Sequence, residues 1–391
     1  MDIVCFSHLR WDFVFQRPQH LLTRLSAHFR IFYVEEPFFN ADTDNYSDNV
    51  QDNVHVIRIY LKGDHQDENV NERQQRILRN LFITVKMHDY VLWYYTPMAL
   101  RITAGLQPVA TVYDCMDELS AFRFAPPALK HLERELLSKA DVVFTGGHSL
   151  YAAKKHQHPN IHSFPSSIDK KHFMQARNVK NDPADQASIP YPRFGFYGVI
   201  DERFDIELIR GVAEKRPDWQ IVLVGPVVKI DPGTLPKNQN IHYLGGKSYN
   251  ELPAYLGGWD IAMVSFALNE STKFISPTKT PEYLAGGRPV ISTSIKDVVE
   301  TYGNNGLVYI ANTVDEFINV AEKELAQKDK KKWLQKVDQF IAEDSWENTV
   351  GNMRKLLYEA IASRQVKLKK KPEATIAHHY LLVKGSLPAA S

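Results

Sequence analysis

Short runs of consecutive apolar residues recur along the first part of the chain and alternate with segments of helical periodicity. Apolar runs of about four to eight residues between polar loops are typical of strands buried on both faces of a parallel sheet. The runs that predict strands lie at residues 3–6, 31–35, 54–59, 90–95, 110–114, 141–145 and 161–165. The segments that predict helices lie at residues 21–25, 72–88, 129–139 and 150–156. This alternation predicts an α/β domain with a doubly wound parallel sheet.

A change of composition divides the chain. In residues 177–192, Asn, Asp, Pro, Gln and Ser replace the apolar pattern, which indicates an interdomain linker. The alternation then restarts, with strands predicted at residues 193–198, 220–226, 241–245, 261–266 and 289–293 and helices at residues 251–256, 316–327, 328–340 and 346–363. We therefore expect one domain over residues 1–176, a second over 193–345, and a mobile basic tail over 364–391.

Length and composition fit an ordinary globular protein. The chain has 391 residues, 44% of them hydrophobic, and this length exceeds what one core usually supports. The formal net charge of +1 gives no field that would favour nucleic acid. Cys5 and Cys115 lie in apolar runs, which favours buried reduced thiols and a cytosolic protein. We expect no signal peptide and no membrane span, because no sufficiently long apolar segment occurs.

The most informative stretch covers residues 276–292, which predict a loop, a short helix, a glycine stop and a buried strand. Pro281 suits the first turn of a helix, and Gly286 and Gly287 suit its end. The start of a helix attracts anions, and Lys279 adds a positive charge there. Glu282, in the first turn, could accept hydrogen bonds from a ribose diol. This is the chemistry of a nucleotide-diphosphate site, although a glutamate in a first turn also occurs simply to compensate the helix dipole.

The loop after the first predicted strand is unusually rich in hydrogen-bonding side chains. Ligands of open α/β sheets bind beyond the carboxyl ends of strands, which is where this loop lies. It carries His8, Arg10, Trp11 and Arg17, so it could bind an anion or a hydroxyl-rich ligand. In the alternative interpretation, the two arginines are solvated and Trp11 packs locally.

Further polar side chains follow other predicted strands. Asp117 comes shortly after the strand at residues 110–114, where a carboxylate could orient a hydroxyl or accept its proton. It could equally be a turn residue that caps the next helix. The predicted helix at residues 72–88 is basic and amphipathic, so a peripheral contact with a membrane surface stands beside simple packing on the sheet. No spacing typical of metal ligands occurs, and no Gly-x-Gly-x-x-Gly follows an early strand, which disfavours an NAD-dependent dehydrogenase.

Three segments together resemble bacterial glycosyltransferases of the GT-B fold, in the large group that includes the family 4 retaining enzymes. The resemblance covers about residues 1–363, and its motifs are Phe6-Ser7-His8-Leu9-Arg10-Trp11 with Gln16-Arg17-Pro18-Gln19-His20, Ala140-Asp141-Val142-Val143-Phe144-Thr145 with Ser149, and Ser276-Pro277 through Lys279 and Glu282 to Gly287. It implies two Rossmann-like domains facing across a cleft, with the helix at residues 346–363 crossing back to the first domain.

The resemblance also implies roles for individual residues. The first domain would bind the acceptor and the second a nucleotide sugar, with a UDP-sugar favoured and neither a cofactor nor a metal required. Glu282 would hold the ribose, and Lys279 and Arg203 the diphosphate. The remaining assignments are Gly198, Ser276, Pro277 and Thr278 for the donor, Arg10, Trp11, Arg17 and His148 for the acceptor, and His8, Asp117 and Glu270 for catalysis.

The sequence departs from the family pattern at one position that matters for catalysis. The family carries a second glutamate eight positions before the ribose-binding one, and here that position is Phe274. The nearest carboxylate, Glu270, lies four residues too early. Either a different loop lets Glu270 serve, or that role is absent.

The function that these patterns predict is transfer of a sugar to a hydroxyl of a glycan or a lipid-linked acceptor, with retention of configuration, in cell-surface polysaccharide synthesis. Two alternatives remain open at this stage. A nucleotide-sugar epimerase of the same fold would need no acceptor, and a non-catalytic relative would bind a glycan or a protein without turnover.

Overall fold

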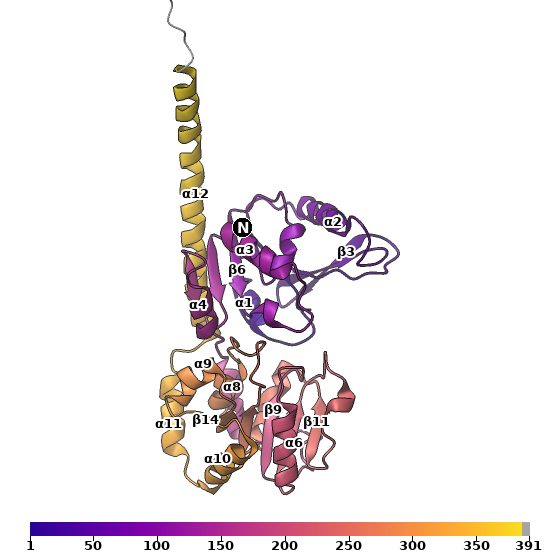
Figure 1. Ribbon diagram of the computed structural model, residues 1–391, viewed down its shortest axis with the longest axis vertical. Coiled ribbons are helices and arrows are strands. Elements are labelled where there is room, and N and C mark those ends of the chain that lie inside the picture. The colour runs from indigo at the N-terminus through magenta and orange to yellow at the C-terminus, as the bar shows by residue number, and fades with distance from the viewer. Residues whose placement is uncertain (385–391) are drawn as a thin grey trace, which may run out of the picture.

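The computed structural model describes residues 1–384 and consists of two α/β domains, one above the other in Figure 1. The strands of the first domain are β1 (Asp2–Ser7), β2 (Arg30–Glu35), β3 (Asn45–Gln51), β4 (Val54–Tyr60), β5 (Tyr90–Tyr94), β6 (Ala110–Cys115), β7 (Val142–Thr145) and β8 (Ile161–Ser163). Its helices are α1 (Arg17–Leu25), α2 (Val70–Thr84), α3 (Leu129–Lys139) and α4 (His148–Lys154), and α5 (Lys170–Phe173) follows on the way to the second domain.

The second domain repeats the same alternation. Its strands are β9 (Arg193–Tyr197), β10 (Gln220–Val224), β11 (Ile241–Gly245), β12 (Ile261–Val264), β13 (Val290–Ser292) and β14 (Tyr309–Ile310). Its helices are α6 (Ile206–Lys215), α7 (Leu252–Gly257), α8 (Lys279–Ala285), α9 (Lys296–Val298), α10 (Val314–Ala326) and α11 (Lys331–Phe340). The last helix, α12 (Trp346–Lys384), returns to the first domain.

Both sheets have the topology of doubly wound domains. The first has the strand order β3-β4-β2-β1-β5-β6-β7-β8 and the second the order β11-β10-β9-β12-β13-β14. Among the described strand pairs, all are parallel except β3 with β4. The predicted fold class, two Rossmann-like parallel sheets, is confirmed.

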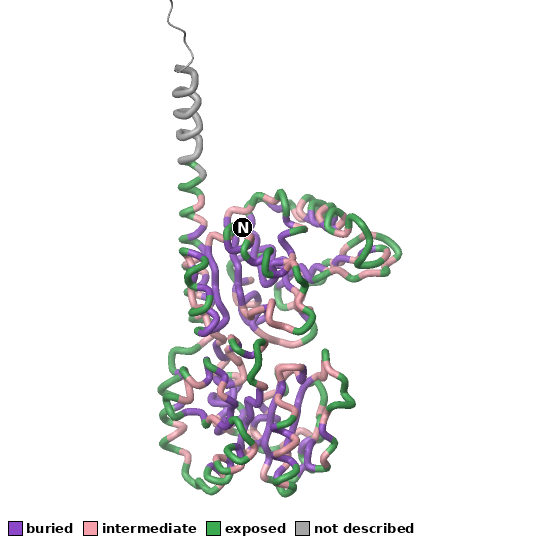
Figure 2. Tube along the Cα trace, viewed as in Figure 1, coloured by how far each residue is buried: buried purple, intermediate pink, exposed green. Residues whose placement is uncertain are grey.

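Apolar side chains alternate between the two faces of the first sheet. In β1, Ile3 and Cys5 belong to one buried cluster, whereas Val4 and Phe6 belong to the other. Helices α2, α3 and α4 cover the second face, and α1 and α12 cover the first. Figure 2 shows the buried strands between these exposed helical surfaces. The carboxyl ends of the strands are thereby left for loops, which is where a site can form.

Helix α12 completes the first domain from the far end of the chain. Trp346, Val350, Met353 and Leu357 are buried in the same cluster as Ile3 of β1. In Figure 1 the helix runs alongside the first domain and extends beyond it. Among the described residues, no helix combines the length and apolar character needed to cross a bilayer.

The structure differs from the sequence expectations in two segments. The Asp- and Asn-rich residues 40–53 predict an exposed loop, but within them residues 45–51 form β3, an edge strand antiparallel to β4. Its side chains are polar because most of them are exposed, so no apolar pattern marks it. The recognisable signal was the turn, where Asp52 and Asn53 adopt φ values of 49° and 63°, as a two-residue hairpin requires.

The second difference concerns the predicted tail. Helix α12 continues past Ser363 to Lys384. Residues 364–371 are mostly good helix formers (Arg, Gln, Leu and four Lys), and the helix continues through Pro372, a residue that usually ends or kinks a helix. The remaining residues, 385–391, lie outside the described part of the chain.

Candidate active site

A cleft of about 970 Å³ lies between the two domains. The first domain contributes the loop after β1 and the end of β6, and the second contributes the loops after β9, β10 and β11 and the start of α8. All of these loops follow carboxyl ends of parallel strands, so the cleft lies where ligands of open α/β sheets bind. Ten predicted site residues line it: Trp11, Arg17, Asp117, Gly198, Arg203, Ser276, Pro277, Thr278, Lys279 and Glu282.

The donor segment, residues 276–282, forms as its sequence pattern predicts. Pro281 occupies the first turn of α8, and the chain leaves the helix through Gly287 with φ at 72°. Glu282 is 5% exposed and accepts a hydrogen bond of 2.7 Å from the hydroxyl of Tyr197 at the end of β9. The backbone N–H of Tyr197 donates in turn to the hydroxyl of Tyr283. These bonds fix α8 to the central strand of its sheet, so the position of Glu282 is set by the fold.

Gly198 makes room for Lys279. A Cβ atom at Gly198 would lie 2.2 Å from Cε and 2.7 Å from Nζ of Lys279, and its φ of 139° is a conformation that other residues rarely adopt. The lysine Nζ lies 5.4 Å from the ring centroids of Phe196 and Phe266. The ammonium group is thereby held inside the cleft with two aromatic faces as neighbours.

Burial shifts both charged groups of this segment towards their neutral forms. It lowers the pKa of Lys279, with the nearby Arg203 acting in the same direction. It raises the pKa of Glu282, against the opposing effects of the Tyr197 hydroxyl and Lys279. An anion bound beside Lys279 would restore its charge, because opposite charges favour each other's ionised forms.

Arg203 is prearranged by a neighbouring carboxylate. Its Nε donates to both oxygens of Asp201 at 3.0 and 3.1 Å, and Nη2 donates at 2.6 Å. The side chain keeps 24% exposure within the cleft, and Cζ lies 5.4 Å from the ring centroid of Phe122 in the opposite domain. A second cation therefore faces the same space as Lys279, with its orientation already fixed.

Asp117 faces the cleft from the first domain. Burial raises its pKa to about 6, although Arg203 and Arg17 oppose this shift. Its carboxylate accepts no hydrogen bond from the described side chains and backbone of residues 1–367, and the residue is half-buried. A carboxylate in this state can accept a proton near neutral pH.

The polar loop after β1 is largely occupied by contacts within its own domain. Arg17 is 3% exposed, donates to Asp114 from Nε and Nη2 at 3.1 and 2.9 Å, and donates to the carbonyl of Phe164 at 2.8 Å. Trp11 is 5% exposed and packs edge-on against Tyr33. These two residues form the wall of the cleft and at the same time hold the loop on the sheet.

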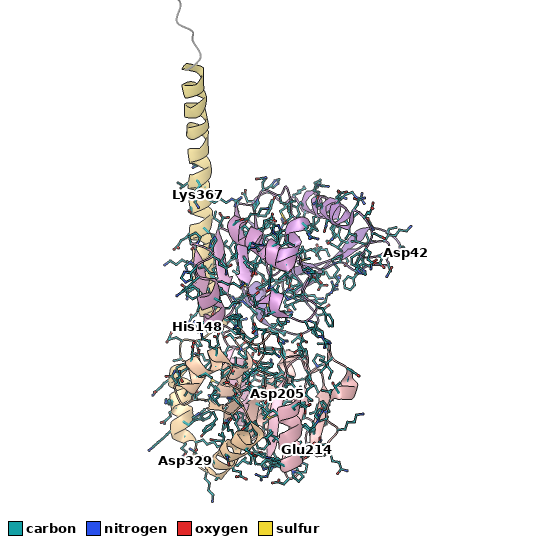
Figure 3. The ribbon with its side chains drawn as sticks, in the orientation of Figure 1. Asp42, His148, Asp205, Glu214, Asp329 and Lys367 are labelled. Carbon is teal, nitrogen blue, oxygen red and sulfur yellow. The ribbon has the colours of Figure 1, made fainter. Side chains whose placement is uncertain are left out.

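Four predicted site residues do not line the cleft. Arg10 pairs with Glu35 at 3.3 Å, and His148 is exposed at the end of the first domain that faces the second (Figure 3). His8 is half-buried, and burial, with a smaller effect from Lys229, lowers its pKa to about 4. Glu270 projects into solvent with 80% of its side chain exposed and lies 3.7 Å from Lys273.

Phe274, the residue at the family's second glutamate position, has a packing role. It lies against the buried cluster of the first domain, so it forms part of the contact between the domains. Because this position is apolar and Glu270 stays outside, the structure places no carboxylate of this loop in the cleft.

Sequence reasoning missed several residues of the site. Tyr197 donates the hydrogen bond that orients Glu282. The only local sequence feature that could have indicated this role is its position before Gly198 at a strand end. Tyr249, in the loop after β11, stacks on His172 at 4.4 Å and on Phe15 of the first domain at 4.6 Å, so it bridges the cleft. The local sequence around Tyr249 does not predict these contacts, because Phe15 and His172 lie far away in the chain.

A cross-domain contact beside the donor segment was also missed. The buried carboxylate of Asp297 accepts hydrogen bonds from the backbone N–H groups of His148 and Ser149 at 2.9 and 2.8 Å. A Cβ atom at Gly147 would lie 2.4 Å from this carboxylate and 2.8 Å from Cβ of Ser276. The second domain therefore caps α4 of the first, directly next to the donor loop. Among the side chains that the structure describes, residues 1–367 and 369, no group of histidine, cysteine and acidic residues could hold a metal ion.

Comparison with known proteins agrees with this geometry. Residues 203–327 match the family model described as "Glycosyl transferases group 1". TuaH of Bacillus subtilis (strain 168), whose name assigns it to teichuronic acid biosynthesis as a glycosyltransferase, is 23% identical over 258 residues. The match covers 60% of this chain and 64% of TuaH, so it spans less than two thirds of that relative.

Solved structures share the fold over nearly the whole chain. E. coli trehalose-6-phosphate synthase bound with UDP-2-fluoro glucose has a TM-score of 0.65 at 11% identity and covers 92% of this chain and 99% of its own. Sucrose-phosphate synthase from Thermosynechococcus elongatus has a TM-score of 0.62 at 15% identity, covering 96% and 99%. Anabaena HepE in complex with UDP and glucose has a TM-score of 0.63 at 13% identity, covering 93% and 100%. The architecture is therefore the two-domain GT-B fold of these proteins.

Proposed function

We propose that this chain, whose residues 203–327 match the group 1 glycosyltransferase model, transfers a sugar from a nucleotide diphosphate sugar to a hydroxyl acceptor. The observation that carries the proposal is the arrangement across the cleft. Lys279, Arg203 and Glu282 face it from the second domain, and Asp117 faces it from the first. Two cations and a ribose-binding carboxylate on one side, with a proton acceptor on the other, are the groups that glycosyl transfer needs.

The donor that we favour is a UDP-sugar. Glu282 would accept hydrogen bonds from the ribose hydroxyls, and Lys279 and Arg203 would bind the diphosphate. Gly198 lets a phosphate approach the strand end closely, as glycine does in other phosphate sites. Ser276, Pro277 and Thr278 would form the wall on which the donor rests. Similar structures were obtained with UDP or with UDP-2-fluoro glucose, which supports this assignment by analogy of fold.

In the reaction, the bond between the sugar's anomeric carbon and the diphosphate oxygen breaks through an oxocarbenium-like state. The electron pair leaves with the diphosphate, where Lys279 and Arg203 stabilise the developing charge. The acceptor oxygen bonds to the same carbon, and its proton passes to Asp117 or directly to the leaving phosphate oxygen. The proposal includes retention of configuration and assigns no part to Glu270, because that side chain lies outside the cleft.

The acceptor that we favour is a glycan or a lipid-linked saccharide. The mouth of the cleft on the first domain is lined by Trp11, Phe13 and Phe15, whose rings suit the apolar faces of sugars. The teichuronic acid relative points to cell-surface polysaccharide synthesis. Cys5 and Cys115 are free, buried thiols, which fits a cytoplasmic site of action, and a lipid-linked acceptor would bring the enzyme to the membrane surface.

The test is nucleotide binding followed by product analysis. Thermal unfolding is measured with UDP, GDP, dTDP and ADP, on the wild type, on Glu282→Ala and on Glu270→Ala as a control. A nucleotide at about a hundred times its dissociation constant adds roughly 2.7 kcal/mol. We expect UDP to stabilise the wild type and the control but not Glu282→Ala.

A second assay separates the remaining functions. Incubation with a UDP-sugar should release UDP faster when a glycan acceptor is added, and sugar should appear on the acceptor. An epimerised donor without acceptor would instead identify an epimerase. If none of the four nucleotides stabilises the wild type, the proposed donor site is wrong.

A further inference from the structure

The turn that carries Asp117 is held from behind by a buried cluster of charged side chains. Lys154, at the end of α4, lies with Nζ 2.7 Å from Oε2 of Glu118 and 2.8 Å from Oε1 of Glu133 on α3. The exposed fractions of these three side chains are 4%, 18% and 11%. The hydroxyls of Tyr113 and Ser120 donate to Glu133 and Glu118 at 2.8 and 2.6 Å. Every member of this cluster therefore has a partner.

The backbone on both sides of Asp117 is also fastened. The N–H of Gly146, just ahead of α4, donates to the carbonyl of Cys115 at 2.9 Å. A Cβ atom at Gly146 would lie 2.4 Å from the carbonyl oxygen of Met116, so this loop and the turn touch directly. The thiol of Cys115 contacts the carbonyl of Asp117 at 3.6 Å. The turn is thus anchored on α3 and α4, whereas the Asp117 carboxylate has no hydrogen-bond partner in the described chain.

We propose that Lys154 is a positioning residue for Asp117: its ion pairs with Glu118 and Glu133 fix the turn at residues 116–118 so that the Asp117 carboxylate faces the cleft. The inference rests on the proposed function, because it presumes that Asp117 meets the acceptor. Lys154 itself is not among the residues that line the cleft.

Burying this cluster costs free energy, which argues for a role beyond packing. Replacement of buried ion pairs by apolar side chains is often neutral or stabilising, so the fold alone does not require them. The two carboxylates raise the pKa of Lys154 against the effect of burial, which keeps it charged. A charged lysine with two fixed partners defines the geometry of the turn more narrowly than apolar packing would, since each bond has its own direction.

The cluster also contributes to the electrostatics around Asp117. The groups that face Asp117 are the cations Arg17, Arg203 and Lys229, the carboxylate Asp201, and its sequence neighbour Glu118 with the partners of that residue. The cluster carries one positive and two negative charges. Loss of the lysine would leave Glu118, the sequence neighbour of Asp117, without its cation, and like charges raise each other's pKa. Lys154→Met should therefore raise the pKa of Asp117, and Glu118→Gln should lower it.

The experiment compares Lys154→Met with Lys155→Met, a matched control that removes an exposed charge from the next position. A third protein, Lys154→Met with Glu133→Gln, restores the net charge of the cluster but not the contact to Glu118. Two measurements need no catalytic activity. They are amide hydrogen exchange over residues 115–119 and the pKa of Asp117 by carboxyl-carbon NMR, with the resonance assigned through Asp117→Asn.

We expect faster exchange in both proteins that lack Lys154 and unchanged exchange in the control. The pKa of Asp117 should rise in Lys154→Met and return in the double variant. The transfer rate kcat should fall on the order of tenfold to a hundredfold in both, as misplacement of a reacting group does. UDP should stabilise all of these proteins against heat equally, because the donor domain is untouched.

Unchanged exchange in Lys154→Met would overturn the positioning role whether or not the protein is a glycosyltransferase. Full recovery of kcat in the double variant would overturn it as well, because charge alone would then suffice. If the lysine variant does not fold, Glu118→Gln provides the test through a lower pKa of Asp117 and faster exchange of the turn. If the Lys154 variants show the exchange and pKa effects but the wild type does not bind UDP, the proposed function fails and the positioning role stands.

Discussion

The two sides of the cleft start from similar sequence signals and use them differently. On the donor side, Lys279 and Arg203 line the cleft, and Glu282 is oriented by a hydrogen bond from Tyr197. On the acceptor side, the guanidinium of Arg17 is bonded to Asp114 and to the carbonyl of Phe164, and Arg10 forms an ion pair with Glu35. Both loops are polar and both follow strand ends. Lys279 and Arg203 line the cleft and stay partly exposed, whereas Arg17 is buried and Arg10 lies outside the cleft.

The difference teaches where a polar side chain finds its partner. On the donor side only Arg203 is arranged by a sequence neighbour, Asp201, whereas Glu282 is held by Tyr197 from 85 residues away. Arg17 meets Asp114, which is 97 residues away, and forms a buried pair that no local pattern displays. A polar loop at a strand end therefore indicates a site only after its long-range pairs have been subtracted.

The largest expected effect is on the acceptor side and concerns stability. Arg17→Met leaves the fully buried Asp114 without its cation, and breaking a buried pair in this way costs about 3–5 kcal/mol. Arg10→Met, at a half-exposed site, should cost less than about 1 kcal/mol. Urea unfolding of both variants measures the difference. Normal stability of Arg17→Met combined with loss of ligand binding would reverse the comparison.

On the donor side we expect a loss of rate with little loss of stability. Lys279→Met removes a cation that stabilises the leaving diphosphate, which typically costs on the order of a hundredfold to a thousandfold in kcat. Lys279 forms no ion pair with the described side chains, and burial disfavours its charge, so its removal should leave the free energy of unfolding unchanged or raise it. Lys273→Met, in the same segment but exposed, is the control. Equal rates for the two variants would contradict the assignment.

The pH dependence of Asp117 links the two sides. Since its pKa is raised to about 6, kcat/KM should fall as the pH drops below about 6. Asp117→Asn should abolish this limb and lower the rate by about a hundredfold. A carboxyl group whose folded pKa is raised stabilises the fold only while protonated, and this contribution is lost as the pH rises through about 6. At pH 7 the asparagine variant should therefore melt at a higher temperature than the wild type. A lower melting temperature would mean that the ionised carboxylate is needed by the fold.

A smaller effect is expected at the strand end. Gly198→Ala places a methyl group against Lys279 in a strained backbone conformation and should cost about 1–3 kcal/mol, together with UDP affinity. Gly245→Ala has a φ of 70° but meets no atom within 4 Å, so it should cost backbone strain and no nucleotide affinity. Calorimetric titration with UDP tests this difference: displacement of Lys279 should lower the UDP affinity of Gly198→Ala, whereas backbone strain alone should leave the affinity of Gly245→Ala unchanged.

The smallest effect is expected at Glu270. Glu270→Gln alters an exposed side chain, so stability should change by less than about 0.5 kcal/mol. We expect kcat to stay within about twofold, a free-energy difference of the same order. A loss of tenfold or more would show that this loop carries Glu270 into the cleft during turnover, and the donor side would then use a residue that the present structure leaves in solvent.

Sequence patterns predicted the fold to a large extent because parallel strands that are buried on both faces consist of continuous apolar residues. The segment at residues 276–287 was predictable because its proline and glycines have backbone meanings of their own. The pairing of Arg17 with Asp114 and the capping of α4 by Asp297 were not, since both join residues about a hundred or more positions apart. Strand β3 was not predicted because its exposed face needs no apolar residues. The length of α12 was not predicted because a basic run that contains Pro372 is typical of a tail as much as of a helix.

Because the last helix packs on the first domain, the domain that is synthesised first is the last to complete its fold. Residues 177–345, about 170 positions, are synthesised after the first sheet and before Trp346 and the rest of α12 can cover it. At roughly 5–20 residues per second, the ribosome needs on the order of 10–30 s for that stretch. Throughout this interval the apolar face formed by Ile3, Cys5 and Trp93 waits for its cover. The domain that leaves the ribosome first is the last to be completed, so a nascent chain must keep one side of its oldest sheet from aggregating until its newest segment arrives.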